Sequence, residues 1–325
     1  MARRRRDESP GGSGLDRVFA SLEDAPAGLH DVAPPAAELP KGLPEALIEL
    51  YARCDGARLY LDAIELLPSA QVTMDAPAKW RFGAVDGDAV AIDHRGRIWR
   101  FDPSLDDDIL DGTGLERWLA GLVEATGLLY DRDGEFAEDA FGEDGEIEPR
   151  LRERQLRAQL KRDPAAPAPR WRLAHALLEQ GTTTDARNEL EQVVADDPAF
   201  AWAWLDLSRI SEQVGELSGA VDEARMGAQT AEGTRHPQAG YFWAQLARLA
   251  SRTGDELLRA EAATKSSLLS PELKRAQLEG VRESLEAGDA ASAKGLLELL
   301  RAVWPRDLEV LDLARRLESP PAPGS

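Results

Sequence analysis

Three aspartates that lie close together, Asp86, Asp88 and Asp93, are the first groups in this sequence that could do chemistry. Two carboxyl groups in different surroundings can act as general acid and general base. Aspartates in turns, however, commonly accept hydrogen bonds from their own backbone. We interpret these three as turn residues, and we predict that the protein is not an enzyme.

The other candidate ligands do not support metal chemistry. The only cysteine, Cys54, excludes an intrachain disulfide and a thiolate metal cluster. The glycine of Asp131-Arg132-Asp133-Gly134 stands fourth, whereas an EF-hand loop needs it at about the sixth place. No nucleophile elbow or phosphate-binding loop occurs in the sequence. We therefore predict no metal and no cofactor, and a hydrolase with an unrecognised site is the alternative that stays open.

The net charge of -20 is unevenly placed. Residues 1–150 carry 16 Lys and Arg against 32 Asp and Glu, a net of -16, and residues 151–325 carry 23 against 27, a net of -4. The chain therefore lacks the basic footprint of a nucleic-acid-binding protein. The acidic half should favour basic partners, such as a basic toxin or effector, and speed their approach at low salt.

Two acidic clusters lie in the acidic half. The first is a candidate partner-binding surface made of Asp102, Asp106, Asp107, Asp108 and Asp111. The second holds nine carboxylates between residues 131 and 148, with Arg132 as the single base. Charge runs of this kind are typical of solvated linkers, and an acidic surface for a basic partner is the other interpretation.

Prolines and glycines, which break helices, recur with the same spacing through the second half; we call these two series the proline and glycine ladders. Prolines recur with gaps of 34, 39, 34 and 34 residues at Pro164, Pro198, Pro237, Pro271 and Pro305. Glycines follow with gaps of 34, 39 and 34 residues at Gly181, Gly215, Gly254 and Gly288. A fixed period in this range is typical of a helical repeat array, which offers an extended concave surface to another chain.

Two units carry the pattern of the tetratricopeptide repeat family, at Trp204, Leu207, Gly215 and Ala220 and again at Trp243, Leu246, Gly254 and Pro271. The chain resembles that family over about residues 166–305. The resemblance implies stacked helix pairs. The third unit departs from the pattern because Arg259 stands where a small residue is expected.

The ladders align one first-helix column of His175, Arg209, Arg248 and Arg282. In tetratricopeptide proteins this column tends to face the concave groove, and the resemblance implies the same here for the column and for Trp202, Tyr241 and Arg252 beside it. Guanidinium groups at a repeat spacing would suit an acidic peptide or a chain terminus. The alternative is a solvated helix face, since arginine stems also cover apolar surface.

The first half predicts helices at residues 14–22, 44–54 and 114–127 and an antiparallel hairpin from 88–93 and 97–102. It resembles the SUKH superfamily over about residues 39–127, on Leu43, Pro44, Leu50, Asp55, Gly56, Phe82, Gly83, Asp86, Gly87, Asp88, Ile92, Asp93, Gly96, Leu115, Trp118 and Leu119. The resemblance implies a non-catalytic α+β binding domain around a twisted antiparallel sheet. Many bacterial members are immunity proteins that neutralise toxins, and others are adaptors.

We therefore expect an α+β N-terminal domain followed by an all-α tetratricopeptide-like solenoid. The expected segments are a disordered tail at 1–14, the SUKH-like domain at 15–130, an acidic linker at 131–149, repeats with capping helices at 150–318 and a disordered tail at 319–325. No stretch approaches the roughly 18 apolar residues of a membrane span, and we expect a cytoplasmic protein. The expected function is protein–protein interaction, with a purely structural assembly scaffold as the alternative.

Overall fold

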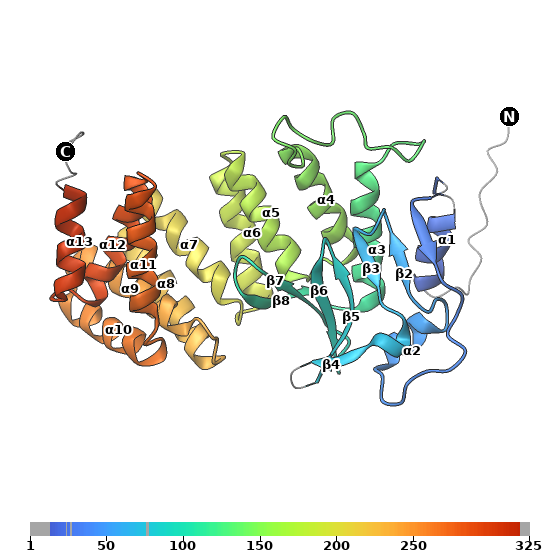
Figure 1. The fold of residues 1–325 in the computed structure, drawn as a ribbon, viewed down its shortest axis with the longest axis horizontal. Helices are drawn as coiled ribbons and strands as arrows, with labels where there is room; N and C mark the ends of the chain where they lie inside the picture. The colour runs from blue at the N-terminus through green and yellow to red at the C-terminus, as the bar shows by residue number, and fades with distance from the viewer. Residues whose placement is uncertain (1–13, 24, 27, 76–77, 319–325) are drawn as a thin grey trace. The chain divides into compact units, whose positions relative to one another are not determined.

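The computed structural model describes residues 14–23, 25–26, 28–75 and 78–318. It divides into two compact units, Met1–Glu189 and Leu190–Ser325. The predicted tail at 319–325, and the one at 1–14 except for Gly14, lie outside the described residues. The predicted fold class is confirmed, because an antiparallel sheet with helices is followed by a series of helices (Figure 1).

The first unit is built on an antiparallel sheet of eight strands in the order β1-β2-β3-β5-β6-β7-β8, with β4 paired to β5. The strands are β1 (His30–Val32), β2 (Ala57–Leu59), β3 (Ile64–Leu66), β4 (Thr73–Asp75), β5 (Lys79–Val85), β6 (Asp88–Asp93), β7 (Ile98–Asp102) and β8 (Asp107–Gly112). The predicted hairpin is the β6–β7 pair, in which Ala91 lies opposite Trp99. The Asp93 carboxylate accepts from the backbone of Arg95 and Arg97 at 2.8 and 3.0 Å, which confirms its predicted turn role.

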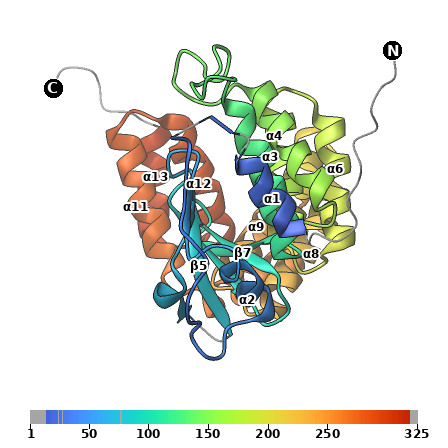
Figure 2. The same cartoon turned by 90° about the vertical axis from the view of Figure 1, so that its right-hand side faces the viewer.

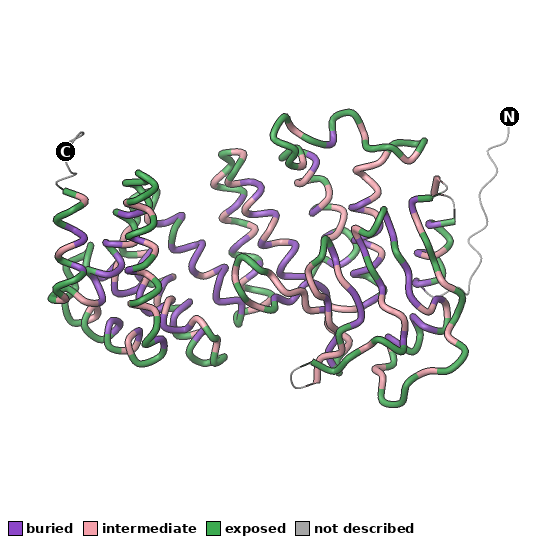
Figure 3. Tube along the Cα trace, viewed as in Figure 1, coloured by how far each residue is buried: buried purple, intermediate pink, exposed green. Residues whose placement is uncertain are grey.

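Three longer helices and two short 3-10 turns complete the α+β part: α1 (Gly14–Glu23), α2 (Glu45–Tyr51), η1 (Ser69–Gln71), α3 (Leu115–Thr126) and η2 (Gly127–Leu129). Each α-helix buries one apolar stripe in a common core with the sheet. Figure 3 shows the buried residues on the inner sides of these elements. In that core the ring of Phe82 on β5 meets Trp118 on α3 edge-on, with centroids 5.8 Å apart.

Two further helices pack on the α+β part although we predicted them to belong to the repeats. They are α4 (Pro149–Arg162), which packs on α3, and α5 (Pro167–Glu179), which packs on α4 and β8. Gly121 on α3 allows the close approach to α4, because an added Cβ would lie 3.0 Å from the Cα of Gln159. Asp163, which follows α4, accepts from the backbone N–H of Thr113 at 2.6 Å. The first unit therefore contains helices from both sides of the predicted boundary at residue 149, which stays a prediction.

The second unit is helical. Its helices are the end of α6 (Thr183–Asp196), then α7 (Ala201–Gln213), α8 (Leu217–Gly233), α9 (Ala239–Thr253), α10 (Glu256–Leu269), α11 (Leu273–Glu286), α12 (Ala290–Val303) and α13 (Leu308–Glu318). The helices α7 and α8 pack as one pair, and α9 and α10 as the next. The ladder glycines of both units have φ between 76° and 85°, the left-handed conformation that ends a helix. The predicted insertion at residues 231–236 falls at the end of α8.

The last helix pair, α11 and α12, packs on the preceding pair in a different way. Its second helix, α12, packs on both α9 and α10. Arg259, the residue that breaks the small-residue pattern, donates from Nη1 to the carbonyl of Ala302 on α12 at 2.9 Å. A small residue could not make this contact. The departure in the sequence therefore coincides with a change in how the helices stack.

Gly83 in β5 is a position where the sheet tolerates no side chain. It lies at the bulge between Arg81 and Gly83, and an added Cβ would be 2.2 Å from the carbonyl oxygen of Glu65. We expect Gly83→Ala to lower the free energy of unfolding by about 2–3 kcal/mol, because β3 and β5 would have to separate. Urea denaturation measures this loss. Gly87→Ala is the control, with φ of 87° but nothing within 4 Å of its Cβ, and should cost only about 1 kcal/mol; equal losses would contradict the close-approach account.

Candidate partner-binding surfaces

The arginines predicted to line the groove of the second unit are tied to carboxylates of the same unit. Arg248 on α9 holds both carboxylate oxygens of Glu212 on α7 through Nη1 and Nη2, each at 2.6 Å. Its Nε also donates to Oε1 of Gln245 at 3.1 Å. Arg252 pairs with the same Glu212. These groups therefore connect the first helices of two successive repeats.

Burial alone would raise the pKa of Glu212, but the hydrogen bonds and charges of Arg248 and Arg252 outweigh burial and hold that pKa below its ordinary value. The hydrogen bond to Glu212 likewise raises the pKa of Arg248. Two guanidinium groups share one carboxylate, so this triad keeps one positive charge. Arg252 is the more open of the two, with 47% of its side chain exposed.

The other predicted groove residues of the second unit take separate positions. Arg209 pairs with Asp206 at 2.9 Å and reaches the hydroxyl of Tyr241 at 3.4 Å. Arg282 on α11 pairs with Glu309 on α13. Trp202 is a correction to the prediction: it is only 8% exposed and packs on Phe242 at 4.8 Å, so its ring belongs to the core.

His175 lies in the first unit, where its ring contacts Trp171 at an interplanar angle of 52° with centroids 4.4 Å apart. Both residues line a cavity of about 390 Å³, together with Arg100, Arg152 and Arg172. His175 thus belongs to the first unit, whereas Arg209, Arg248 and Arg282 belong to the second.

The second unit contains a cavity of about 540 Å³ bounded by α9, α11 and α12. Its lining residues are Tyr241, Gln245, Arg248, Gln277, Ser292, Gly295, Leu296, Glu298 and Leu299. The Oε1 atom of Gln277 is buried and accepts no hydrogen bond from the described residues. A buried polar atom without a partner is costly, so a donor that reached this atom would be stabilising.

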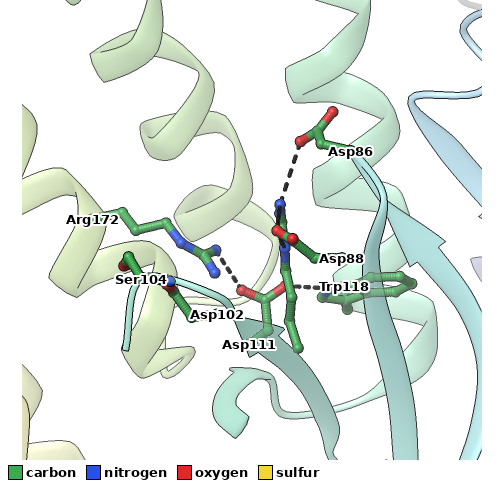
Figure 4. A network of polar contacts seen from close by, with 8 residues as sticks. Asp86, Asp88, Asp102, Ser104, Asp111, Trp118 and Arg172 are labelled. Carbon is green, nitrogen blue, oxygen red and sulfur yellow. Dashed lines mark hydrogen bonds and ion pairs between the residues drawn. The ribbon is translucent and has the colours of Figure 1, made fainter. Parts of the chain in front are cut away.

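A second carboxylate-centred network lies in the first unit, where β8 meets α5 (Figure 4). Asp111 is 3% exposed and accepts from Nη1 of Arg172 at 2.7 Å and from the indole Nε1 of Trp118 at 2.8 Å. Arg100 adds a second positive charge next to it. The side chain of Arg100 is anchored to Asp88 at 2.7 Å and to Asp86 at 3.4 Å.

The charges of Arg172 and Arg100 decide the protonation state of Asp111. Burial raises its pKa, but the two guanidinium groups and the Trp118 hydrogen bond outweigh burial and hold the pKa below its ordinary value. Asp111 is therefore ionised at neutral pH.

Asp86 and Asp88 differ from the role predicted for them, in which each would accept hydrogen bonds from its own turn. Both carboxylates pair instead with Arg100 on β7.

Asp111 is consequently a correction to the predicted acidic surface: its carboxylate is enclosed and cannot meet a partner. Asp102 accepts from the backbone of Ser104 at 3.0 Å in its own turn. Asp108 pairs with Lys79 at 2.8 Å. Asp106 and Asp107 complete the turn region, Asp106 with a φ of 50°. The structure thus leaves only part of this cluster open to solvent.

Sequence reasoning missed the partners of these groups. Glu212, Gln277 and the pairing of Arg172 with Asp111 were not predicted. For Glu212 a signal existed, because it stands one helical turn after the column residue Arg209. The partner of Arg172 is 61 residues away in sequence, and no local pattern marks either Arg172 or Gln277.

A tetratricopeptide repeat family model matches residues 177–239. No curated protein matches the chain. Similar solved structures include MamA, with a TM-score of 0.34 and 19% identity, covering 50% of this chain and 87% of that one. Another is Pseudomonas aeruginosa PilF, with a TM-score of 0.33 and 15% identity, covering 52% of this chain and 90% of that one. A third is YrrB, described as a tetratricopeptide protein with an unusual peptide-binding site. Its TM-score is 0.33 at 10% identity, and the match covers 51% of this chain and 82% of that one. The repeat match supports a protein–protein interaction scaffold. At these TM-scores the structural similarities add no argument about partners.

Two other kinds of site have no support in the described part of the chain. No group of three or more His, Cys, Asp or Glu side chains there is arranged to hold a metal ion. None of the helices in that part is both long and apolar enough to span a bilayer.

We expect Asp111→Asn to lower the free energy of unfolding by about 3 kcal/mol at pH 7, because the half-buried guanidinium groups of Arg172 and Arg100 would lose the buried counter-charge between them. The folded-state pKa of Asp111 is lowered, so its contribution is present above the unfolded value of about 3.9 and is lost as the pH falls through the folded value. Urea denaturation should therefore show the difference from wild type shrinking below about pH 4.

The matched control is Asp106→Asn, since Asp106 is exposed and asparagine tolerates its positive φ. That variant should stay within about 0.5 kcal/mol of wild type. A loss for Asp111→Asn no larger than the control's would contradict the role given to the network.

Proposed function

We propose that this chain is a non-catalytic protein–protein interaction protein of the cytoplasm. Its helical repeats bind a partner chain, and its α+β part is an acidic SUKH-like binding module of the immunity or adaptor type. The repeat match supports the first role, and the charge of -16 over residues 1–150 supports the second.

The observation that carries the proposal is the cavity of the second unit with the orphaned Oε1 of Gln277. The cavity combines amide side chains with apolar walls from Leu296 and Leu299. An extended peptide suits such a lining, because its backbone N–H groups can donate to a glutamine oxygen while its side chains fill the apolar part. No activated nucleophile is required for this recognition.

The charge of the peptide follows from the neighbours of the cavity. Glu298 lines it, so an acidic side chain inside would be repelled. Arg252 presents an open guanidinium and shares its only described carboxylate with Arg248. We therefore place the acidic residue or chain terminus of the partner beside Arg252, and its backbone in the cavity.

The acidic module would act on a different partner. Asp106 lies exposed on the turn between β7 and β8, and a carboxylate there can attract a basic toxin or effector. An immunity role predicts that a neighbouring gene encodes such a toxin, whereas an adaptor role does not.

The peptide site can be tested with Gln277→Leu. The variant removes an acceptor that has no partner, so its stability should equal or exceed that of wild type. It should nevertheless bind the captured partner at least fivefold more weakly, because the N–H that Gln277 accepts would lose its acceptor. Affinity capture at low salt identifies the partner, and calorimetry with the full chain measures its affinity.

Gln213→Leu, on an exposed position of α7, is the control and should bind normally. Equal affinities of Gln277→Leu and wild type for every captured protein would contradict the cavity as the binding site.

A structural assembly scaffold is the second candidate, and α10 carries the observation that favours it. Leu257 and Leu268 are 87% and 75% exposed, and their spacing of eleven residues places them on one helix face. An exposed apolar stripe of this kind can pair two copies of a chain. The assembly role predicts concentration-dependent association in sedimentation that Leu257→Ser with Leu268→Ser abolishes; a monomer at all concentrations would contradict it.

A further inference from the structure

Two exposed aromatic rings stand in the acidic segment that links η2 to α4. Phe136 and Phe141 are 52% and 37% exposed. Their centroids are 5.0 Å apart in an edge-to-face contact. In Figure 3 the segment between α3 and α4 is drawn largely as exposed residues. Exposed aromatic pairs of this kind are typical of interaction sites.

The rings are held in place by a series of contacts that begins in the core. Tyr60 is 8% exposed and stacks on Tyr130 at 5.4 Å, and Tyr130 stacks on Phe136 at 5.0 Å. The hydroxyl of Tyr130 donates to the carbonyl of Tyr60 at 3.2 Å. The outer rings are therefore positioned before any partner arrives, which lowers the entropic cost of binding.

The backbone around the rings forms two short hairpins, which we call the acidic hairpins (residues 130–136 and 141–147). Antiparallel bridges close them at Tyr130 with Phe136 and at Phe141 with Ile147. In the first hairpin Asp131 accepts from the backbone of Asp133 at 2.8 Å. In the second, Asp144 accepts from the backbone of Glu146 at 3.0 Å. The segment predicted as an acidic linker thus has defined turns (Figure 2).

A cavity of about 610 Å³ lies beside the second hairpin. Five carboxylates line it, from Glu143, Asp144, Glu146, Glu148 and Glu179, against the single guanidinium of Arg152. Arg152 lies 3.4 Å from Glu146 and 4.0 Å from Glu179. The lining therefore has an excess of four negative charges, which only a cationic ligand can balance.

We propose that the acidic hairpins and this cavity bind an arginine-rich segment of a partner protein. A guanidinium group stacks on aromatic faces and also donates to carboxylates in a planar fork, so arginine satisfies both features of the site. An apolar partner would have to desolvate the carboxylates, and a nucleic acid would be repelled. The site rests on the proposed role of the acidic half, which it extends to residues outside the β7–β8 turn.

The test uses the full chain and a fluorescent peptide of alternating arginine and glycine, with anisotropy read at low and moderate salt. A peptide with citrulline in place of arginine keeps the shape but lacks the charge, and it should not bind. Phe136→Ala with Phe141→Ala should weaken binding of the arginine peptide about tenfold. Leu61→Ala with Met74→Ala removes two other exposed apolar side chains of the first unit and should leave the affinity within about twofold.

The carboxylates are tested separately. Glu143→Gln with Glu148→Gln should weaken binding more than Glu38→Gln with Glu49→Gln, which removes the same charge from exposed positions outside the proposed surfaces. Equal affinity of wild type and the double phenylalanine variant would overturn the hairpin site while leaving the acidic half as a binder. Failure of the arginine peptide to bind at low salt would overturn both the hairpin site and the role of the acidic half as a binder.

The chain's own Arg3 to Arg6 are the competing occupant. Replacing these four arginines by serine in the full chain should leave the peptide affinity unchanged if the site serves a partner. A clear increase in affinity would assign the site to the chain's own terminus and overturn the partner assignment.

Discussion

A carboxylate withdrawn from water needs a counter-charge, and in each unit one such carboxylate, buried in the first and half-buried in the second, joins separate elements. In the first unit Asp111 on β8 is neutralised by Arg172 of α5 and by the nearby Arg100. This pairing joins α5 to β8. In the second unit Glu212 of α7 is held by Arg248 and Arg252 of α9, which ties successive repeats together. Desolvation makes these pairs obligatory, and so each carboxylate fixes where a helix can lie.

This constraint changes which residues are available to partners. The arginines of the aligned column are partly occupied by Asp206, Glu212 and Glu309. Other groups than these arginines remain available for recognition. In the second unit they include an amide oxygen in a cavity, and in the first unit a pair of exposed rings lies among carboxylates. Recognition by such groups depends on hydrogen-bond geometry and ring contacts more than on a row of free cations.

The periodic features were predictable from the sequence, because they arise from local backbone preferences. The ladder glycines, the β6–β7 hairpin and the turn role of Asp93 follow from residue types a few positions apart. The α+β and helical-repeat classes were therefore predictable. The SUKH assignment of the first half stays a prediction.

The candidate sites were less predictable, since they depend on contacts distant in sequence. Asp111 was placed in a surface cluster because its neighbours in sequence are acidic, yet its partner Arg172 lies 61 residues away. Trp202 shared a helix face with groove residues but packs on Phe242 of the next repeat. Phe136 and Phe141 lie within a run of acidic residues, and nothing in that run marks them as contact residues.

Hydrogen–deuterium exchange of the full chain, with and without its captured partner, tests most directly the claim that the second-unit cavity is the partner-binding site. The account predicts new protection in peptides from α9, α11 and α12, which bound the cavity, with little change on the solvent side of α10. Protection confined to α10, or none in the second unit, would contradict it.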